Sequence, residues 1–144
     1  MDGGLTMQQG IDAVIDLGLY PPDTACERID PLALSLLGAL EYSPVVQGTW
    51  TWPGWRRPHE LSGYVGRMTG FGGGHATLVC AIDSNSGYWT PVFLNSWGPA
   101  WGRYGFGTLT LQQFEVVQLA LPLAIRVGED FARWKCPAEL VVRG

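Results

Sequence analysis

The chain has 144 residues, enough for one compact domain with a substantial core and too few for two ordinary domains. Hydrophobic residues make up 47% of the sequence, which excludes disorder as its bulk state, and charged residues make up only 15%, against a usual share of about 25%. The net charge is −4 and the only adjacent basic pair is Arg56-Arg57, so we expect no nucleic-acid partner.

Two helices are predicted in the first third of the chain. Residues 5–18 carry apolar side chains at helical spacing and end at a glycine, which favours a helix stop. Residues 20–23 are a predicted turn. Residues 31–41 are the second predicted helix, because Pro31 suits a first helical turn and Ser43-Pro44 ends the segment.

The rest of the chain is predicted to form an antiparallel sheet, because it is rich in β-branched and aromatic residues. The predicted strands are residues 45–52, 75–83, 88–94 and 108–111, with a last strand at the end of 115–127. Residues 53–74 are a predicted loop. Helices followed by strands indicate an α+β fold, and we expect its sheet to be partly barrel-like. We expect residues 1–127 to form the domain and 128–144 a tail.

Several classes of protein are argued against by simple counts. No apolar run approaches the roughly 18 residues of a membrane span, and no basic region precedes an apolar one at the amino terminus, so we expect neither a membrane segment nor a signal peptide. Three cysteines and two histidines without paired spacing predict neither a disulfide framework nor a metal site. We expect reduced thiols, an intracellular setting and no cofactor.

A histidine and an asparagine carry the strongest chemical signal. His75 opens an apolar strand in GGGHATLVCAID, and Asn95 follows the next strand in LNSWGPAWGRYGFG. An asparagine beside a histidine fixes the tautomer at one ring nitrogen and directs the other nitrogen at a substrate or a thiol. We predict that the two side chains lie within about 3.5 Å or share one water, with Trp97 over the pair to exclude water.

These segments resemble the papain-like cysteine peptidases, whose hallmarks are "GHAV" at the start of a strand and a later "KNSWG..WG..GY". The matching residues are Gly74-His75-Ala76, Asn95-Ser96-Trp97-Gly98, Trp101-Gly102 and Gly105-Phe106-Gly107. Upstream, Asp2-Gly3-Gly4, the turn ending at Pro21 and residues 34–48 are similar to the family's earlier segments. The resemblance covers roughly residues 2–112, and it implies a papain-like fold with His75 and Asn95 at the catalytic positions.

The family's nucleophile has no counterpart in this sequence. In the family, the cysteine lies on a helix in a C-G-[SA]-C-[WY] context, with the histidine about 130 residues further on. Counting back from His75 gives a position before Met1. The resemblance therefore implies a domain without its amino-terminal third, lacking both the cysteine and the oxyanion-hole glutamine that precedes it.

None of the three cysteines is expected to replace that nucleophile. Cys26 is predicted to be structural, because Pro31 would interrupt a long helix there and the family often holds a structural cysteine in this neighbourhood. Cys80 is five residues from His75 on one predicted strand, so the two side chains should face opposite ways. Cys136 lies beside Lys135, whose charge would lower the thiol pKa, but nothing places it at His75.

Other conspicuous residues have structural interpretations. Trp50, Trp52 and Trp55 suit either packing or a ligand platform, and packing is favoured. His59 lies in a proline-rich loop and is expected to be solvated. The run 72–74 is all glycine, but no helix follows it, which argues against a phosphate-binding loop.

Two functions remain open. The preferred one is a papain-like pseudo-peptidase, a structural or protein-binding subunit of a larger assembly such as a phage particle. A protein partner or a second copy would cover an apolar face centred on Trp50, Trp52, Trp55 and Phe71. The alternative is one half of a split cysteine peptidase whose cysteine is on another chain. Either way, we expect no peptide hydrolysis by the isolated chain, and a location in the cytoplasm or a viral particle.

Overall fold

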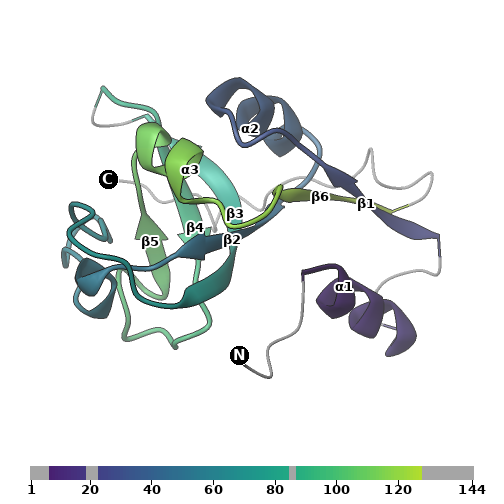
Figure 1. Ribbon diagram of the computed structural model, residues 1–144, viewed down its shortest axis with the longest axis horizontal. Coiled ribbons are helices and arrows are strands. Elements are labelled where there is room, and N and C mark those ends of the chain that lie inside the picture. The colour runs from purple at the N-terminus through teal and green to yellow at the C-terminus, as the bar shows by residue number, and fades with distance from the viewer. Residues whose placement is uncertain (1–6, 19–22, 85–86, 128–144) are drawn as a thin grey trace.

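The computed structural model describes residues 7–18, 23–84 and 87–127, which form a six-stranded sheet with helices on both faces (Figure 1). The elements in chain order are α1 (Met7–Asp16), β1 (Thr24–Arg28), α2 (Ala33–Leu40), β2 (Val45–Trp50), the 3-10 helix η1 (Pro53–Arg56), β3 (Gly74–Asp83), β4 (Thr90–Leu94), β5 (Phe106–Thr108), α3 (Leu111–Val117) and β6 (Leu123–Val127).

The sheet is antiparallel throughout, with strand order β1-β6-β2-β3-β4-β5. The last strand along the chain, β6, therefore lies between β1 and β2. The edge strands β1 and β5 do not pair with each other, so the sheet does not close into a barrel. The α+β fold is confirmed, and the partly barrel-like expectation is corrected to an open sheet.

The central strands β2 and β3 have one buried face. Val45, Gln47 and Thr49 alternate along β2 and are fully buried, and the residue opposite Thr49 on β3 is His75. Side chains on a strand alternate between the two faces of the sheet. His75, near the start of β3, therefore lies on the face of the sheet that carries the core.

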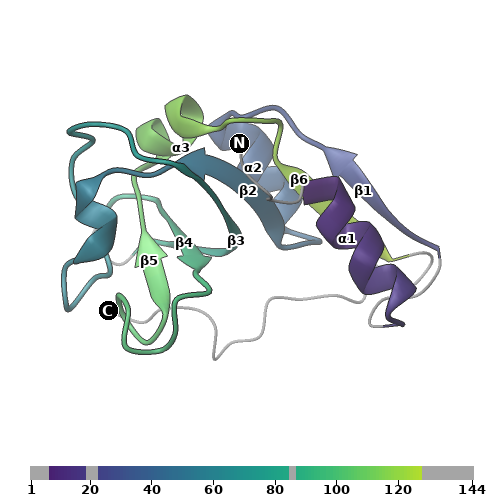
Figure 2. The ribbon, with the colours of Figure 1, turned by 60° about the horizontal axis from the view of Figure 1, so that its bottom comes forward.

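The helices cover both faces at one end of the sheet. Figures 1 and 2 place α2 and α3 together on one face, with α1 against the other face at the β1–β6 end. On α3, Phe114 and Val117 are buried and lie three residues apart, hence on one side of the helix. On α2, Leu36 and Ala39 have the same spacing and the same burial.

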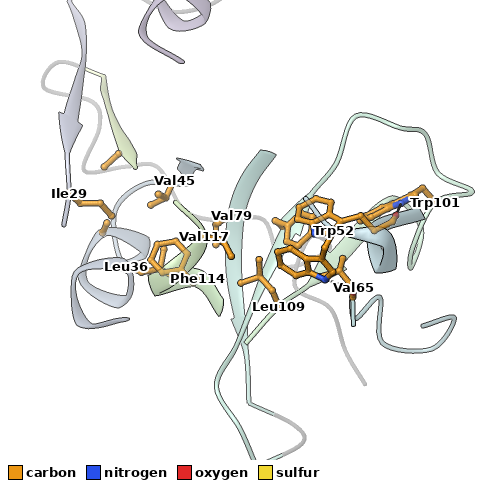
Figure 3. Close-up of a cluster of buried hydrophobic side chains, with 14 residues drawn as sticks. Ile29, Leu36, Val45, Trp52, Val65, Val79, Trp101, Leu109, Phe114 and Val117 are labelled. Atoms are coloured by element: carbon orange, nitrogen blue, oxygen red, sulfur yellow. Dashed lines mark hydrogen bonds between the residues drawn. The ribbon is translucent and has the colours of Figure 1, made fainter. Parts of the chain in front are cut away.

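The core changes in character along the molecule. Figure 3 shows Leu36, Val45 and Phe114 packed at the α2–α3 end, and Trp52 and Trp101 at the other end. All belong to one continuous hydrophobic cluster. The aromatic end lies beside η1 and the start of β3. The imidazole of His75 therefore packs next to tryptophan side chains.

Most predicted elements are confirmed, and three were not predicted. The helices expected at 5–18 and 31–41 and the strands expected at 45–52 and 88–94 occur with slightly shorter bounds, and the strand expected at 75–83 begins one residue earlier. The unpredicted elements are β1, η1 and α3. The strand expected at 108–111 instead ends at Thr108, because Thr110 caps α3.

Some predictions fall on residues whose placement is not described. These are the start of the first helix, most of the 20–23 turn, the turn residues 85–86 and the tail from residue 128, which includes Cys136. Within the described residues, no helix has the length and apolarity that a membrane crossing requires.

Candidate active site

The predicted histidine–asparagine pair is present. His75 is the second residue of β3, and Asn95 directly follows β4. Because Leu94 lies opposite Leu78, the hairpin brings Asn95 diagonally beside His75. The distance from His75 Nε2 to Asn95 Oδ1 is 2.8 Å, which confirms the predicted proximity.

The hydrogen bonds of Asn95 assign the tautomer of His75. The backbone N–H of Ser96 donates to Asn95 Oδ1 at 2.8 Å, so this side-chain atom is an acceptor and is the amide oxygen. His75 Nε2 must then donate its proton to the same oxygen. In the neutral imidazole, the lone pair is therefore on Nδ1, which makes no hydrogen bond within the described part of the chain.

The backbone around Asn95 is held by a tight glycine-rich loop. The N–H of Asn95 donates to the carbonyl of Gly105 at 3.0 Å, across the loop that starts at residue 96. The loop can return so closely because Gly98, Gly102 and Gly105 adopt positive φ angles of 94°, 59° and 93°. Asn95 is only 6% exposed, and its buried Nδ2 has no partner among the described residues.

Two tryptophans hold the imidazole from different sides. The ring of Trp97 stacks on that of His75, with centroids 4.7 Å apart and an interplanar angle of 28°. Trp55 meets the imidazole edge-on at 6.3 Å and is 1% exposed. Trp97 was predicted to lie over the hydrogen bond. Its contact is with the imidazole ring itself, and it leaves Trp97 48% exposed.

Neither described cysteine can reach His75. Cys80 lies five residues further along β3, which is about 16 Å at the usual strand rise. Its Sγ is buried and contacts the carbonyl of Val92 at 3.8 Å. A bulge between Val79 and Ala81 interrupts the strand register, so separation along the strand excludes Cys80 more securely than alternation of faces does.

Cys26 is excluded by the order of the strands. It lies on β1, and β6 and β2 separate that strand from β3, so it is about 14 Å away across three strand spacings. Its position on a strand opposite Ile125 suits the predicted structural role. No thiol among the described residues therefore lies within reach of His75.

The remaining sequence candidates have structural places. Trp52 and Trp55 are 2% and 1% exposed, so the predicted packing role is correct for both. The prediction that they lie at the centre of a protein interface is wrong, because neither side chain reaches the surface. Trp50 is 40% exposed and pairs with Phe71 at 6.1 Å between ring centroids. His59 Nδ1 accepts from two backbone N–H groups of the following turn, which gives it a local structural role.

Sequence reasoning missed a pocket next to Trp97. A hollow of about 440 Å³ lies between η1 and the 70–73 segment, and it is lined by Trp97 and by Arg56. The sequence marked Arg56 only as half of a basic pair, because nothing in a loop pattern tells which side chain turns toward a site. The described residues contain no group of three or more His, Cys, Asp or Glu that could hold a metal ion.

The fold has counterparts among proteins of known structure. No protein-family model matches the chain, and no curated protein matches it. Among solved structures, the chain is similar to xylellain, a cysteine protease from Xylella fastidiosa, with a TM-score of 0.59 and 21% identity over 70% of this chain.

A second similar structure is that of bromelain, a protease from Ananas comosus, in complex with the E64 inhibitor. Its TM-score is 0.53, with 15% identity over 69% of this chain. The chain spans only 39% of the xylellain chain and 48% of the bromelain chain. The likeness is therefore to part of a papain-like protease fold.

Proposed function

We propose that this domain supplies the general-base half of a papain-like cysteine-peptidase site, with the nucleophilic thiol coming from another chain or segment. The observation that carries the proposal is the hydrogen bond of 2.8 Å between His75 Nε2 and Asn95 Oδ1. It leaves the basic Nδ1 without a partner among the described residues. A base with no thiol near it among the described residues is suited to a thiol brought from another chain or segment.

The chemistry of the pair fits a thiol. A cysteine becomes nucleophilic as its thiolate, and an adjacent imidazole can take the proton. When Nδ1 of His75 accepts that proton, Nε2 keeps its own proton and its bond to Asn95, so the imidazolium retains an acceptor on one side. Trp97 and Trp55 keep the ring in this orientation through the transfer. The hydrogen bond to Asn95 fixes the tautomer and the two tryptophans fix the ring. Both therefore favour transfer of the thiol proton to Nδ1 of His75.

A base alone does not make a peptidase. Attack on a peptide carbonyl also needs donors for the developing oxyanion, and removing a single such donor costs roughly 10²- to 10³-fold in rate. In the family that the sequence resembles, that donor is a glutamine just ahead of the nucleophilic cysteine. The isolated chain should therefore not hydrolyse peptides, in keeping with a split site.

The experiment is covalent labelling with an epoxide probe of the E64 type. The purified chain is incubated with the probe, and Cys26, Cys80 and Cys136 are mapped by mass spectrometry. We expect no labelling that depends on His75. Labelling of Cys136 that disappears in His75→Ala would instead place the nucleophile within this chain, and Cys136→Ser is the matched control.

The second arm seeks the missing thiol. The tagged chain is recovered from its native source, together with its bound proteins, and treated with the same probe. A labelled cysteine on another segment, lost with His75→Ala and with Asn95→Ala, is the expected result. If bound protein is recovered without any thiol whose labelling depends on His75, the split-peptidase proposal fails.

A pseudo-peptidase that binds protein is the second candidate, favoured by exposed apolar side chains near β2. Trp50, Phe71 and Leu119 are 40%, 61% and 46% exposed. With charged residues at 15% of the chain, such a surface suits a structural or protein-binding subunit, for example in a phage particle or a cytoplasmic assembly. In this case a partner binds with equal affinity to wild type and to His75→Ala, and no thiol is activated.

A further inference from the structure

The pocket beside Trp97 has one charged side chain. Its volume is about 440 Å³, within the range of roughly 300–1,000 Å³ typical of ligand sites. Arg56 is the only charged residue among the described residues that line it. No described carboxylate pairs with Arg56, so the guanidinium faces the pocket or solvent without a counter-charge from this part of the chain.

A second hollow differs from this pocket in the charges of the residues that line it. It has a volume of about 380 Å³ and is lined by both Glu60 and Arg103. Opposite charges on one wall can neutralise each other, so this hollow has no preference for an anion. At the Arg56 pocket, by contrast, no described residue in the lining compensates the positive charge of the guanidinium.

The walls of the Arg56 pocket are fixed by the fold. The N–H and the hydroxyl of Thr51 both donate to the carbonyl of Gly73, at 3.1 and 3.0 Å, and the N–H of Gly72 donates back to Thr51 at 2.7 Å. Gly54, two residues before Arg56 on η1, lies against the carbonyl of Val65 so closely that no Cβ fits. Both sides of the pocket are therefore held by the backbone.

The pocket adjoins the histidine site through a shared residue. Trp97 lines it and also stacks on His75 at 4.7 Å between centroids. Phe71, which also lines the pocket, is 61% exposed and offers a second apolar surface. A ligand in the pocket would thus lie one aromatic ring away from the imidazole, beside two aromatic side chains and a guanidinium.

We propose that this pocket is a subsite for a carboxylate of a peptide bound at the His75 site, with Arg56 as its specificity-determining residue. The inference rests on the proposed function, in which a peptide passes beside His75. Arginine holds carboxylates through two parallel N–H···O bonds, and the aromatic walls suit the methylene groups of a glutamate side chain. A free peptide C-terminus offers the same carboxylate chemistry.

The test is peptide binding to the full chain, measured by NMR at the indole N–H of Trp97. The probe is acetyl-Ala-Ala-Glu-Ala-Ala-amide, and its twin has glutamine in place of glutamate. We expect the glutamate peptide to bind about two- to fivefold more tightly, because one partly exposed ion pair is at stake. Acetyl-tetra-alanine with a free or an amidated C-terminus separates the two sources of carboxylate.

Two neighbouring arginines provide the control. Arg56→Gln should bring the ratio of the two dissociation constants to one, whereas Arg57→Gln, at an exposed residue outside the pocket lining, should leave it unchanged. Arg56→Glu should reverse the charge preference, so that a third peptide with lysine in place of glutamate binds more tightly than the glutamate peptide. Equal binding of both peptides to wild type, or a preference that survives Arg56→Gln, overturns the inference.

This outcome is separable from that of the proposed function. Peptide binding needs no thiol, so a glutamate preference that depends on Arg56 supports the subsite even if no activated cysteine is found. Conversely, a thiol activated by His75 together with equal binding of the two peptides sinks the subsite and leaves the catalytic proposal standing.

Discussion

Asn95 decides which nitrogen of His75 is available for chemistry, because its oxygen is already fixed as an acceptor by Ser96. In Asn95→Ala the Nε2 proton loses its partner. We expect this proton to exchange with solvent about fivefold faster or more, the equivalent of about 1 kcal/mol for one hydrogen bond. The measurement is proton NMR of the chain labelled at its histidine ring nitrogens.

The second histidine provides the assignment control. The sequence has two histidines, so His59→Gln leaves only the signals of His75. A slowly exchanging proton on Nδ1 rather than Nε2, or an exchange rate unchanged by Asn95→Ala, would contradict the assigned tautomer and with it the availability of Nδ1 as a base.

Trp55 is the residue on which the site and the core both depend. It is 1% exposed and packs against Phe93 at 4.9 Å between ring centroids. Its carbonyl accepts the indole N–H of Trp101 at 2.6 Å. Trp55→Ala should destabilise the fold by about 3–5 kcal/mol, the usual cost of a large buried aromatic, in denaturant unfolding followed by circular dichroism.

The matched variant is Trp50→Ala, which removes the same side chain from a position that is 40% exposed. Its cost should stay below about 1.5 kcal/mol, since part of that side chain is already in water. If both variants lose the same stability, the division between a buried and an exposed tryptophan is wrong.

The pair of residues at the site could be predicted from sequence, whereas their surroundings could not. His75 lies on β3 and Asn95 directly follows β4, its partner in a hairpin, so local strand pairing brings the two residues together. The wall at Trp55 and the pocket at Arg56 depend on where a loop of more than fifteen residues folds, which no periodicity specifies. The distance that keeps Cys26 away from His75 could not be predicted either, because it depends on the order of the strands in the sheet.

The element α3 depends on Thr110, the capping residue that directly precedes it. The Thr110 hydroxyl accepts from the N–H of Gln113 at 2.9 Å, and the Gln113 side chain accepts from the N–H of Thr110 at 3.0 Å. This capping box satisfies two N–H groups of a helix that has only seven residues. Thr110→Ala should cost about 1 kcal/mol in unfolding free energy, whereas Thr110→Ser should cost less than half of that.

The outcome of that experiment bears on the packing around α3. Gln113 also donates to the hydroxyl of Tyr64 at 3.2 Å and to the carbonyl of Gly66 at 3.0 Å, so the cap is joined to the 57–73 segment. A Thr110→Ala variant as stable as wild type would mean that these contacts alone position the helix and that the cap contributes nothing.

Two of the unpredicted elements, α3 and β1, escaped sequence reasoning for different reasons. The Thr-Leu-Thr-Leu run at 108–111 alternates like a strand, and this pattern hid the capping signal of Thr110 and Gln113. For β1, the residues Thr24–Arg28 include two charged side chains and no apolar alternation. It is a strand because β6 pairs with all five of its residues, and such pairing between distant segments is not visible in a local window.

At the scale of the whole molecule, β6 connects the two ends of the fold. It pairs with β1 along its whole length and with the start of β2, so a segment near residue 125 lies between strands from the first third of the chain. The α+β class could be predicted from the order of elements, because it needs only their types. The strand order could not, because it depends on contacts across about a hundred residues.

One surface of the folded chain is unusually apolar. Trp50 lies opposite Gly74 in the sheet, and the side chain of Leu119 occupies the space that a Cβ on Gly74 would take, so both lie on the same outer face. Phe71 pairs with Trp50 at 6.1 Å. We call these three exposed residues, Trp50, Phe71 and Leu119, the Trp50 patch.

We expect the Trp50 patch to associate, either with a second copy or with another protein. A stable interface buries roughly 1,200 Å² or more in total, so the patch would form its centre and not its whole extent. Light scattering on the purified chain at tens of micromolar should show assembly, or binding of a hydrophobic dye. The double variant Trp50→Ser with Phe71→Ser should abolish both, because it removes the apolar area that drives them.

Leu34→Ser, at an 83% exposed leucine on α2, is the control for a general loss of surface hydrophobicity and should change neither. A monodisperse monomer without dye binding would contradict the expectation, because it would show that three neighbouring apolar side chains stay solvated without a partner.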